Sequence, residues 1–271
     1  MGINWSKAYE EGQASKTVPA AAPAATTATV ATTAAAAVPA TTTKASSDNI
    51  VSDVVNAVES GVAELFDGLV GVSNSRSSFG SSSSSSGSAG DSYVGNYGSP
   101  YGANIMKVDS ISGYDFTATF TNTQSEAITV NIWNKVGPDF LPLSGSALAP
   151  KSTTLTFVLK AGASQAVAFM ENSQVAWAQA CSNTAASGAY ATTWGEANFL
   201  SAGSGYDVSA IMNSGGNNYN MSIKSEEAPD CTSDMTQNYW LTATDPVGNS
   251  DGSCYIAQST ATLKVSLGGT V

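Results

Sequence analysis

Short runs of alternating polar and apolar residues, separated by turn-forming residues, extend from about residue 102 to the C-terminus. Alternation with a period of two places successive side chains on opposite faces of a strand, and it does not suit a helix. The clearest runs are 115–121, 128–133, 154–159 and 166–169, and further strand candidates are 104–108, 206–212, 219–223, 239–243 and 260–266. About nine or ten strands at this spacing predict an all-β sandwich.

The N-terminal third has a different composition and is divided into three segments. Residues 1–46 are predicted to be a disordered stalk, because 17–46 are almost wholly Thr, Ala, Pro, Val and Ser, as in O-glycosylated stalks. Within 47–72, Val and Leu recur at three- and four-residue spacing, which predicts one amphipathic helix. Residues 73–90 are rich in Ser and Gly and predict a flexible linker. The β-sandwich domain is therefore expected to span 91–271.

The charge balance excludes several classes of protein. Lysine and arginine total 10 against 21 acidic residues, a net charge of −11, and no basic run is present. Phosphate neutralisation needs clustered basic side chains, so no nucleic-acid partner is expected. No run of about 18 apolar residues occurs, so no membrane span is expected. The chain has no histidine, which removes Ser-His-Asp catalysis and histidine-ligated zinc. No cofactor and no metal site are predicted.

Three cysteines and two glycosylation sequons bear on the compartment. Cys231 and Cys254 are flanked by turn-forming residues, and a disulfide between them would contribute about 3 kcal/mol by the chain-entropy estimate. Cys181 is left over, and a buried free thiol is the simplest expectation. Asn4 and Asn220 satisfy the N-glycosylation rule, although Asn220 falls within a predicted strand. Two sequons in a chain of this length often occur by chance, but the low charged content (11%) with many hydroxyl and amide side chains predicts a secreted protein, extracellular or in the cell wall.

Two resemblances narrow the fold. Residues 101–109, 114–117, 120–123 and 130–138 resemble fungal secreted proteins typified by an Aspergillus allergen. In that family a low-complexity N-terminal half precedes a compact C-terminal domain. Its members are known mainly as secreted antigens, so this resemblance implies no activity.

The second resemblance concerns 193–199, 205–211 and 220–223, whose order and spacing are similar to those of thaumatin-like proteins. It implies a β-sandwich with an acidic cleft, and some members of that family bind or weakly hydrolyse β-1,3-glucan. By position, Glu196 and Asp207 correspond to two of the cleft carboxylates. The chain departs from the pattern at Met212, where a third aspartate would fall. It also has no arginine in 91–271 and lacks a dense disulfide framework.

Glu196, Asp207 and Trp194 are therefore the candidate ligand-binding residues. Neighbouring strands could bring both carboxylates onto one face, and the indole beside them could stack on a sugar ring. The alternatives are two solvated carboxylates and a tryptophan anchored in the core. Hydrolysis needs two carboxylates at a fixed separation with pKa values pushed apart, so no catalytic residue is assigned.

These observations predict a secreted, cell-wall-associated binding or interaction protein. Its expected partner is a neutral polysaccharide such as β-glucan, or a host or cell-wall protein. One alternative is a secreted antigen or host-directed effector without a small ligand. The other is a weak carboxylate-dependent glycan hydrolase, although an enzyme is the less favoured interpretation.

Overall fold

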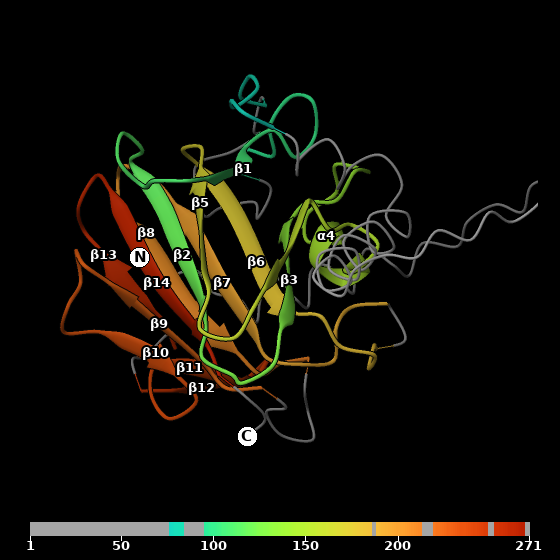
Figure 1. Cartoon of the computed structure of the whole chain (residues 1–271), viewed down its shortest axis with the longest axis vertical. Coiled ribbons are helices and arrows are strands. Elements are labelled where there is room, and N and C mark those ends of the chain that lie inside the picture. Colours follow the sequence, from blue (N-terminus) through green and yellow to red (C-terminus); the bar gives the residue numbers. More distant parts are fainter. Residues whose placement is uncertain (1–75, 84–94, 186–187, 213–218, 249–251, 269–271) are drawn as a thin grey trace, which may run out of the picture.

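The described residues form two β-sheets packed face to face (Figure 1). The computed structural model describes residues 76–83, 95–185, 188–212, 219–248 and 252–268. The prediction of an all-β sandwich is confirmed. The single helix among the described residues is α4 (Ser144–Leu148), so no described helix is long and apolar enough to cross a bilayer. The predicted stalk 1–46 and helix 47–72 lie outside the described residues.

The six-stranded sheet has a mixed arrangement around its C-terminal strand. The last described strand pairs parallel with β2 over seven residues and antiparallel with β9. This strand therefore lies in the middle of the sheet and not at its edge. In spatial order the strands are β1 (Ile105–Val108), β5 (Ser164–Phe169), β2 (Phe116–Asn122), β14 (Ala261–Leu267), β9 (Met221–Ser225) and β10 (Thr232–Asp234).

The eight-stranded sheet lies behind it in Figure 1. Its central strands are long and antiparallel, while β8 is joined along its other edge by two short strands, β11 and β13. In spatial order the strands are β12 (Asp245–Val247), β11 (Tyr239–Thr242), β8 (Ser204–Ser209), β7 (Trp194–Phe199), β6 (Ser173–Gln179), β3 (Ile128–Asn134) and β4 (Leu155–Leu159), with β13 (Cys254–Ile256) on β8.

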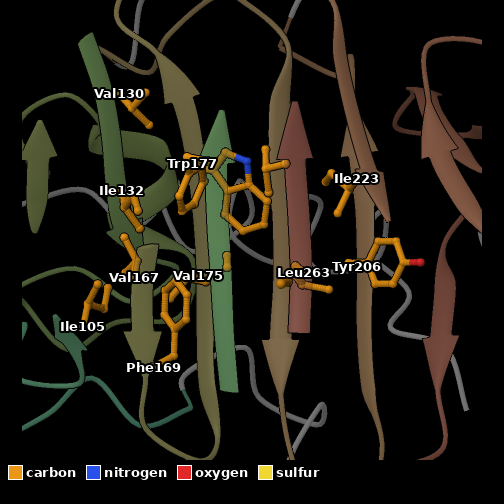
Figure 2. Packing of buried hydrophobic residues seen from close by; sticks show 14 of the residues in the cluster. Ile105, Val130, Ile132, Val167, Phe169, Val175, Trp177, Tyr206, Ile223 and Leu263 are labelled. Carbon is orange, nitrogen blue, oxygen red and sulfur yellow. The ribbon is translucent and has the colours of Figure 1, made fainter. Parts of the chain in front are cut away.

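The hydrophobic core fills the space between the two sheets (Figure 2). Phe120 of the six-stranded sheet packs against Trp177 of the eight-stranded sheet in an edge-to-face contact, with ring centroids 5.4 Å apart. Alternation explains why these side chains meet: Val130 and Ile132 point inward from β3, while Asn131 between them points outward. In β3 the alternation in the sequence therefore matches the inner and outer faces of the sheet.

The predicted linker includes one segment that pairs with the domain. Ser81 forms a two-way backbone bridge with Ser99, and the Gly80 N–H donates to the carbonyl of Ala103 at 3.1 Å. The Phe79 ring contacts Tyr114 edge to face at 5.9 Å. The described residues 79–83 thus belong to the packed domain, which differs from the expected start at residue 91.

Candidate functional site

The two predicted carboxylates lie directly opposite each other in the eight-stranded sheet. Glu196 on β7 and Asp207 on β8 are cross-strand partners in the antiparallel register. Their neighbours Ala197 and Tyr206 belong to the core between the sheets. Because strand side chains alternate, both carboxyl groups project from the outer face of this sheet. The structure therefore brings these two candidate residues together.

A lysine outside the set of candidate residues neutralises one of these carboxylates. The Lys135 ammonium forms an ion pair with Glu196, and the two side chains are only 3% and 5% exposed. Lys135 directly follows β3, and its backbone is held on both sides. Its N–H donates to the Gln174 carbonyl at 2.9 Å, and its carbonyl accepts from the Gly145 N–H at 3.0 Å. Strand β6 and helix α4 thereby fix a buried cation beside the acidic pair.

Trp194 lies in a second buried cluster on the same outer face. Its ring is 5% exposed and meets Trp133 edge to face, with centroids 5.0 Å apart. The indole N–H donates to the Tyr190 carbonyl at 2.9 Å. This burial favours the alternative of a tryptophan anchored by packing over an indole that stacks on a sugar.

The glycine between Trp194 and Glu196 faces the other way, into the core between the sheets, and shows how closely that core is packed. A Cβ atom at Gly195 would lie 2.2 Å from Nε1 of Trp177, far inside van der Waals contact, so only glycine fits at this position.

A glycosidase carboxyl has to touch its substrate. With 4% of Glu196 and 1% of Asp207 exposed, neither carboxyl presents such a surface. The acidic pair is a buried polar cluster and not an open cleft.

An aromatic cluster elsewhere does reach the surface. Tyr97, Tyr101 and Phe140, which we call the three-ring cluster, lie with centroids 5.1 Å apart for Tyr97 and Phe140, and 6.0 Å apart for the two tyrosines. Phe140 is 55% exposed and its neighbour Leu141 57%. Exposed large apolar side chains gathered in one place are typical of binding surfaces. The three-ring cluster is therefore the second candidate site.

The loop that carries Phe140 is held in a strained conformation. Phe140 has a φ of 61°, a left-handed value that costs an L-residue roughly 1–2 kcal/mol. Hydrogen bonds maintain it: the Phe140 N–H donates to the Gly137 carbonyl at 2.9 Å, and the Leu141 N–H to the Asp139 carboxylate at 3.1 Å. Ser144 donates to the same carboxylate. Strain that displays an apolar ring to solvent indicates a functional constraint.

Tyr101 anchors the base of the three-ring cluster. Its hydroxyl donates to the Val136 carbonyl at 2.7 Å, which ties the ring to the start of the Phe140 loop. Burial raises the pKa of Tyr101 above its usual value, so the phenol stays a protonated donor at neutral pH. The cluster is thus a preformed surface built from two distant segments of the chain.

Comparison with known proteins places the domain in a family. A family model described as the Allergen Asp f 4-like domain matches residues 103–267, which is more than half of the chain. The chain belongs to this family. Allergen Asp f 4 of Aspergillus fumigatus is 40% identical over 129 residues, or 44% of this chain and 39% of that protein. The match thus spans well under half of the length of that relative.

Two solved structures are similar to this member of the Asp f 4-like family. The thaumatin-like xylanase inhibitor TLXI has a TM-score of 0.34 at 14% identity, covering 55% of this chain and 97% of its own. The protein elicitor MoHrip2 from Magnaporthe oryzae has a TM-score of 0.31 at 12% identity, covering 56% and 97%. At these scores the likeness concerns the β architecture and carries no argument about function.

The structure also locates the other residues that the sequence singled out in this family member. Cys231 and Cys254 form a disulfide. Cys181 is a half-buried free thiol whose pKa is raised by burial. Asn220 is half-buried and directly precedes β9, whereas Asn4 lies outside the described residues. No group of three or more residues able to hold a metal ion occurs among the residues that the structure describes.

The three-ring cluster was not predicted from the sequence, although the sequence contains a local signal for it. The segment 138–142 reads Pro-Asp-Phe-Leu-Pro, in which two large apolar residues stand between two prolines that cannot continue a strand. An apolar pair in a segment unsuited to the core is a candidate for exposure. The contact of Phe140 with Tyr97 and Tyr101 is a long-range one, which no local pattern could predict.

Proposed function

We propose that this chain is an extracellular, cell-wall-associated binding protein without enzymatic activity, and that it recognises neutral glycan such as β-glucan through the three-ring cluster. The observation that carries the proposal is the exposed Phe140 ring, held at a positive φ against Tyr97. The disulfide supports the extracellular setting, because such bonds persist in oxidising compartments. The allergen relative fits the same setting.

Neutral sugar suits the chemistry of this surface. One face of a pyranose ring carries C–H bonds and packs on an aromatic ring, while tyrosines add a polar edge to the apolar face. Tyr97 and Phe140 are tilted by 37°, so together they form a curved surface and not a flat one. The loop's own carboxylate, Asp139, is engaged by Ser144. Recognition therefore depends on ring contact and not on ion pairing.

The test is retention of the purified chain on insoluble β-1,3-glucan, cellulose and chitin. Phe140→Ala should weaken retention about tenfold, since loss of one stacked ring is worth on the order of 1.4 kcal/mol. Retention of the unaltered chain should change little with added salt. Tyr255→Ala is the matched control, because Tyr255 is 53% exposed and lies on β13, outside the cluster. Equal losses in both variants, or no retention of the unaltered chain, would refute glycan recognition.

A protein partner is the second candidate, and one observation favours it. Leu141 is 57% exposed beside Phe140, and an aliphatic side chain adds apolar area that a protein interface buries. This reading corresponds to a secreted antigen or host-directed effector. Leu141→Ala separates the two: it should leave glycan retention unchanged, but weaken binding to a host or cell-wall protein.

The hydrolase alternative has the least support. Its two carboxylates are buried, and Glu196 is paired with Lys135. Two results together would establish hydrolase activity. The unaltered chain would release reducing sugar from β-1,3-glucan, and a folded Glu196→Gln variant would not. We expect no release from either protein.

A further inference from the structure

A glycosylation sequon lies beside a surface pocket at one end of the six-stranded sheet. Asn220, Met221 and Ser222 form the sequon. The sequence placed Asn220 inside a strand, but β9 begins only at Met221. The Asn220 carbonyl accepts from the Gly268 N–H at 3.1 Å, and the residue is half-buried. The acceptor therefore stands at the end of the sheet, where a bulky substituent can be accommodated.

The pocket next to the sequon has a volume of about 310 Å³. Asn220 itself lines it, together with the half-buried Met235 and the hydroxyl-bearing Thr123 and Thr236; Met221 also borders it, but its side chain is buried in the core. Thioether side chains provide adaptable apolar contact, while hydroxyl groups both donate and accept hydrogen bonds. An N-acetylhexosamine presents the matching groups, namely ring hydroxyls and an acetamido methyl. The lining is therefore suited to a single sugar unit.

The wall of the pocket formed by the turn after β10 is ordered by hydrogen bonds. One oxygen of the Asp234 carboxylate accepts from the Thr236 N–H at 2.8 Å and from the Thr236 hydroxyl at 2.7 Å. The other accepts from the Gln237 side chain at 3.1 Å. These bonds fix the turn after β10 before any ligand arrives, which lowers the ordering cost of binding.

We propose that Asn220 is an N-linked glycosylation site and that the proximal sugar of its glycan occupies this pocket. In the transfer, the side-chain amide nitrogen of Asn220 forms a bond to the anomeric carbon of a sugar carried on a lipid-linked diphosphate. The bond from that carbon to the phosphate oxygen breaks, the diphosphate leaves with its electron pair, and the amide nitrogen loses one proton to a base. The inference requires passage through a secretory pathway but does not depend on the three-ring cluster.

Mass spectrometry tests the modification. The full chain is fused to the secretion leader of a eukaryotic host, which the host cleaves, and the secreted protein is collected. Treatment with a peptide N-glycanase in heavy-oxygen water should convert Asn220 to a labelled aspartate. Ser222→Ala should abolish the label, whereas Ser222→Thr, which keeps the sequon, should retain it. The control variant Ser110→Asn creates an additional sequon with Ile111 and Ser112 in an exposed turn. An unlabelled Asn220 in a chain whose engineered sequon is occupied overturns the proposal.

The position of the first sugar is tested by thermal unfolding. An endoglycosidase that leaves one N-acetylhexosamine on Asn220 should yield a protein whose Tm is about 2 °C higher than that of the fully deglycosylated form. Full removal of the glycan converts Asn220 to aspartate, so the unglycosylated variant Asn220→Asp is the matched reference. Its Tm should equal that of the fully deglycosylated protein. Equal Tm values for the one-sugar form and this reference would show that the sugar does not occupy the pocket.

Discussion

Removal of the buried cation at Lys135 should destabilise the domain strongly. Lys135→Met keeps most of the side-chain volume but removes the ammonium group. The carboxylates of Glu196 and Asp207 then remain buried without this cation. The ion-paired side chains are 3% and 5% exposed, and breaking a buried pair by removing one partner typically costs about 3–5 kcal/mol. For a domain of this size each kcal/mol shifts Tm by about 2–4 °C. The expected fall in Tm is therefore about 6–20 °C.

A second ion pair in the same chain provides the control. Lys264 and Glu226 lie 2.8 Å apart, but their side chains are 64% and 57% exposed, so solvent screens the pair and its contribution is under about 1 kcal/mol. Urea and thermal unfolding followed by tryptophan fluorescence should separate Lys135→Met clearly from Lys264→Met. The double variant Lys135→Met with Glu196→Gln should recover part of the loss. Equal midpoints for the two lysine variants would refute the assignment of a buried, desolvated pair.

Two further predictions concern the C-terminal half of the domain. Reduction of the Cys231–Cys254 disulfide should lower Tm in scanning calorimetry by several degrees, since closing this loop contributes about 3 kcal/mol, whereas Cys181→Ser should leave Tm unchanged. Burial tends to raise the pKa of Glu227, but hydrogen bonds from Ser225 and the backbone outweigh it and hold the pKa below the usual value. Its stabilisation is therefore present above the unfolded pKa and is lost as pH falls through the folded one. The difference between the unaltered chain and Glu227→Gln in urea midpoint should thus be largest at neutral pH and disappear in acid.

Strands with polar outer side chains were predictable from the sequence, and those with apolar side chains on both faces were not. β2, β3 and β4 alternate, because their outer side chains are mostly polar, even though six of the seven residues of β3 are buried. β6 does not alternate: Val175 and Trp177 face the core, while Ala176 and Ala178 face the tryptophan cluster of the outer face. Periodicity carries no signal where apolar side chains occupy both faces.

The environment of the candidate site was less predictable than its position. The spacing of Glu196 and Asp207 on adjacent strands predicted their convergence, because an antiparallel register is a local property of the hairpin. Their burial depends on Lys135, which lies 61 positions away from Glu196 in the sequence and meets it across strand β6. Trp194 is enclosed partly for the same reason, since Trp133 reaches it from β3, whereas Tyr190 lies only four positions before it in the sequence. Loops over the outer face decide exposure, and no local pattern describes them.

The buried ion pair and the exposed three-ring cluster are parts of one structural unit. Lys135 begins the loop that carries Phe140, and Gly145 at its far end donates to the Lys135 carbonyl, so the loop is closed at its base. The Lys135 side chain anchors that base to β7 through Glu196, while Tyr101 binds the Val136 carbonyl from outside. A strained tip needs a rigid base, because a loose loop would relax Phe140 out of its left-handed conformation. The carboxylate that resembles a cleft residue therefore serves here as the anchor of the loop through which we propose that the protein binds.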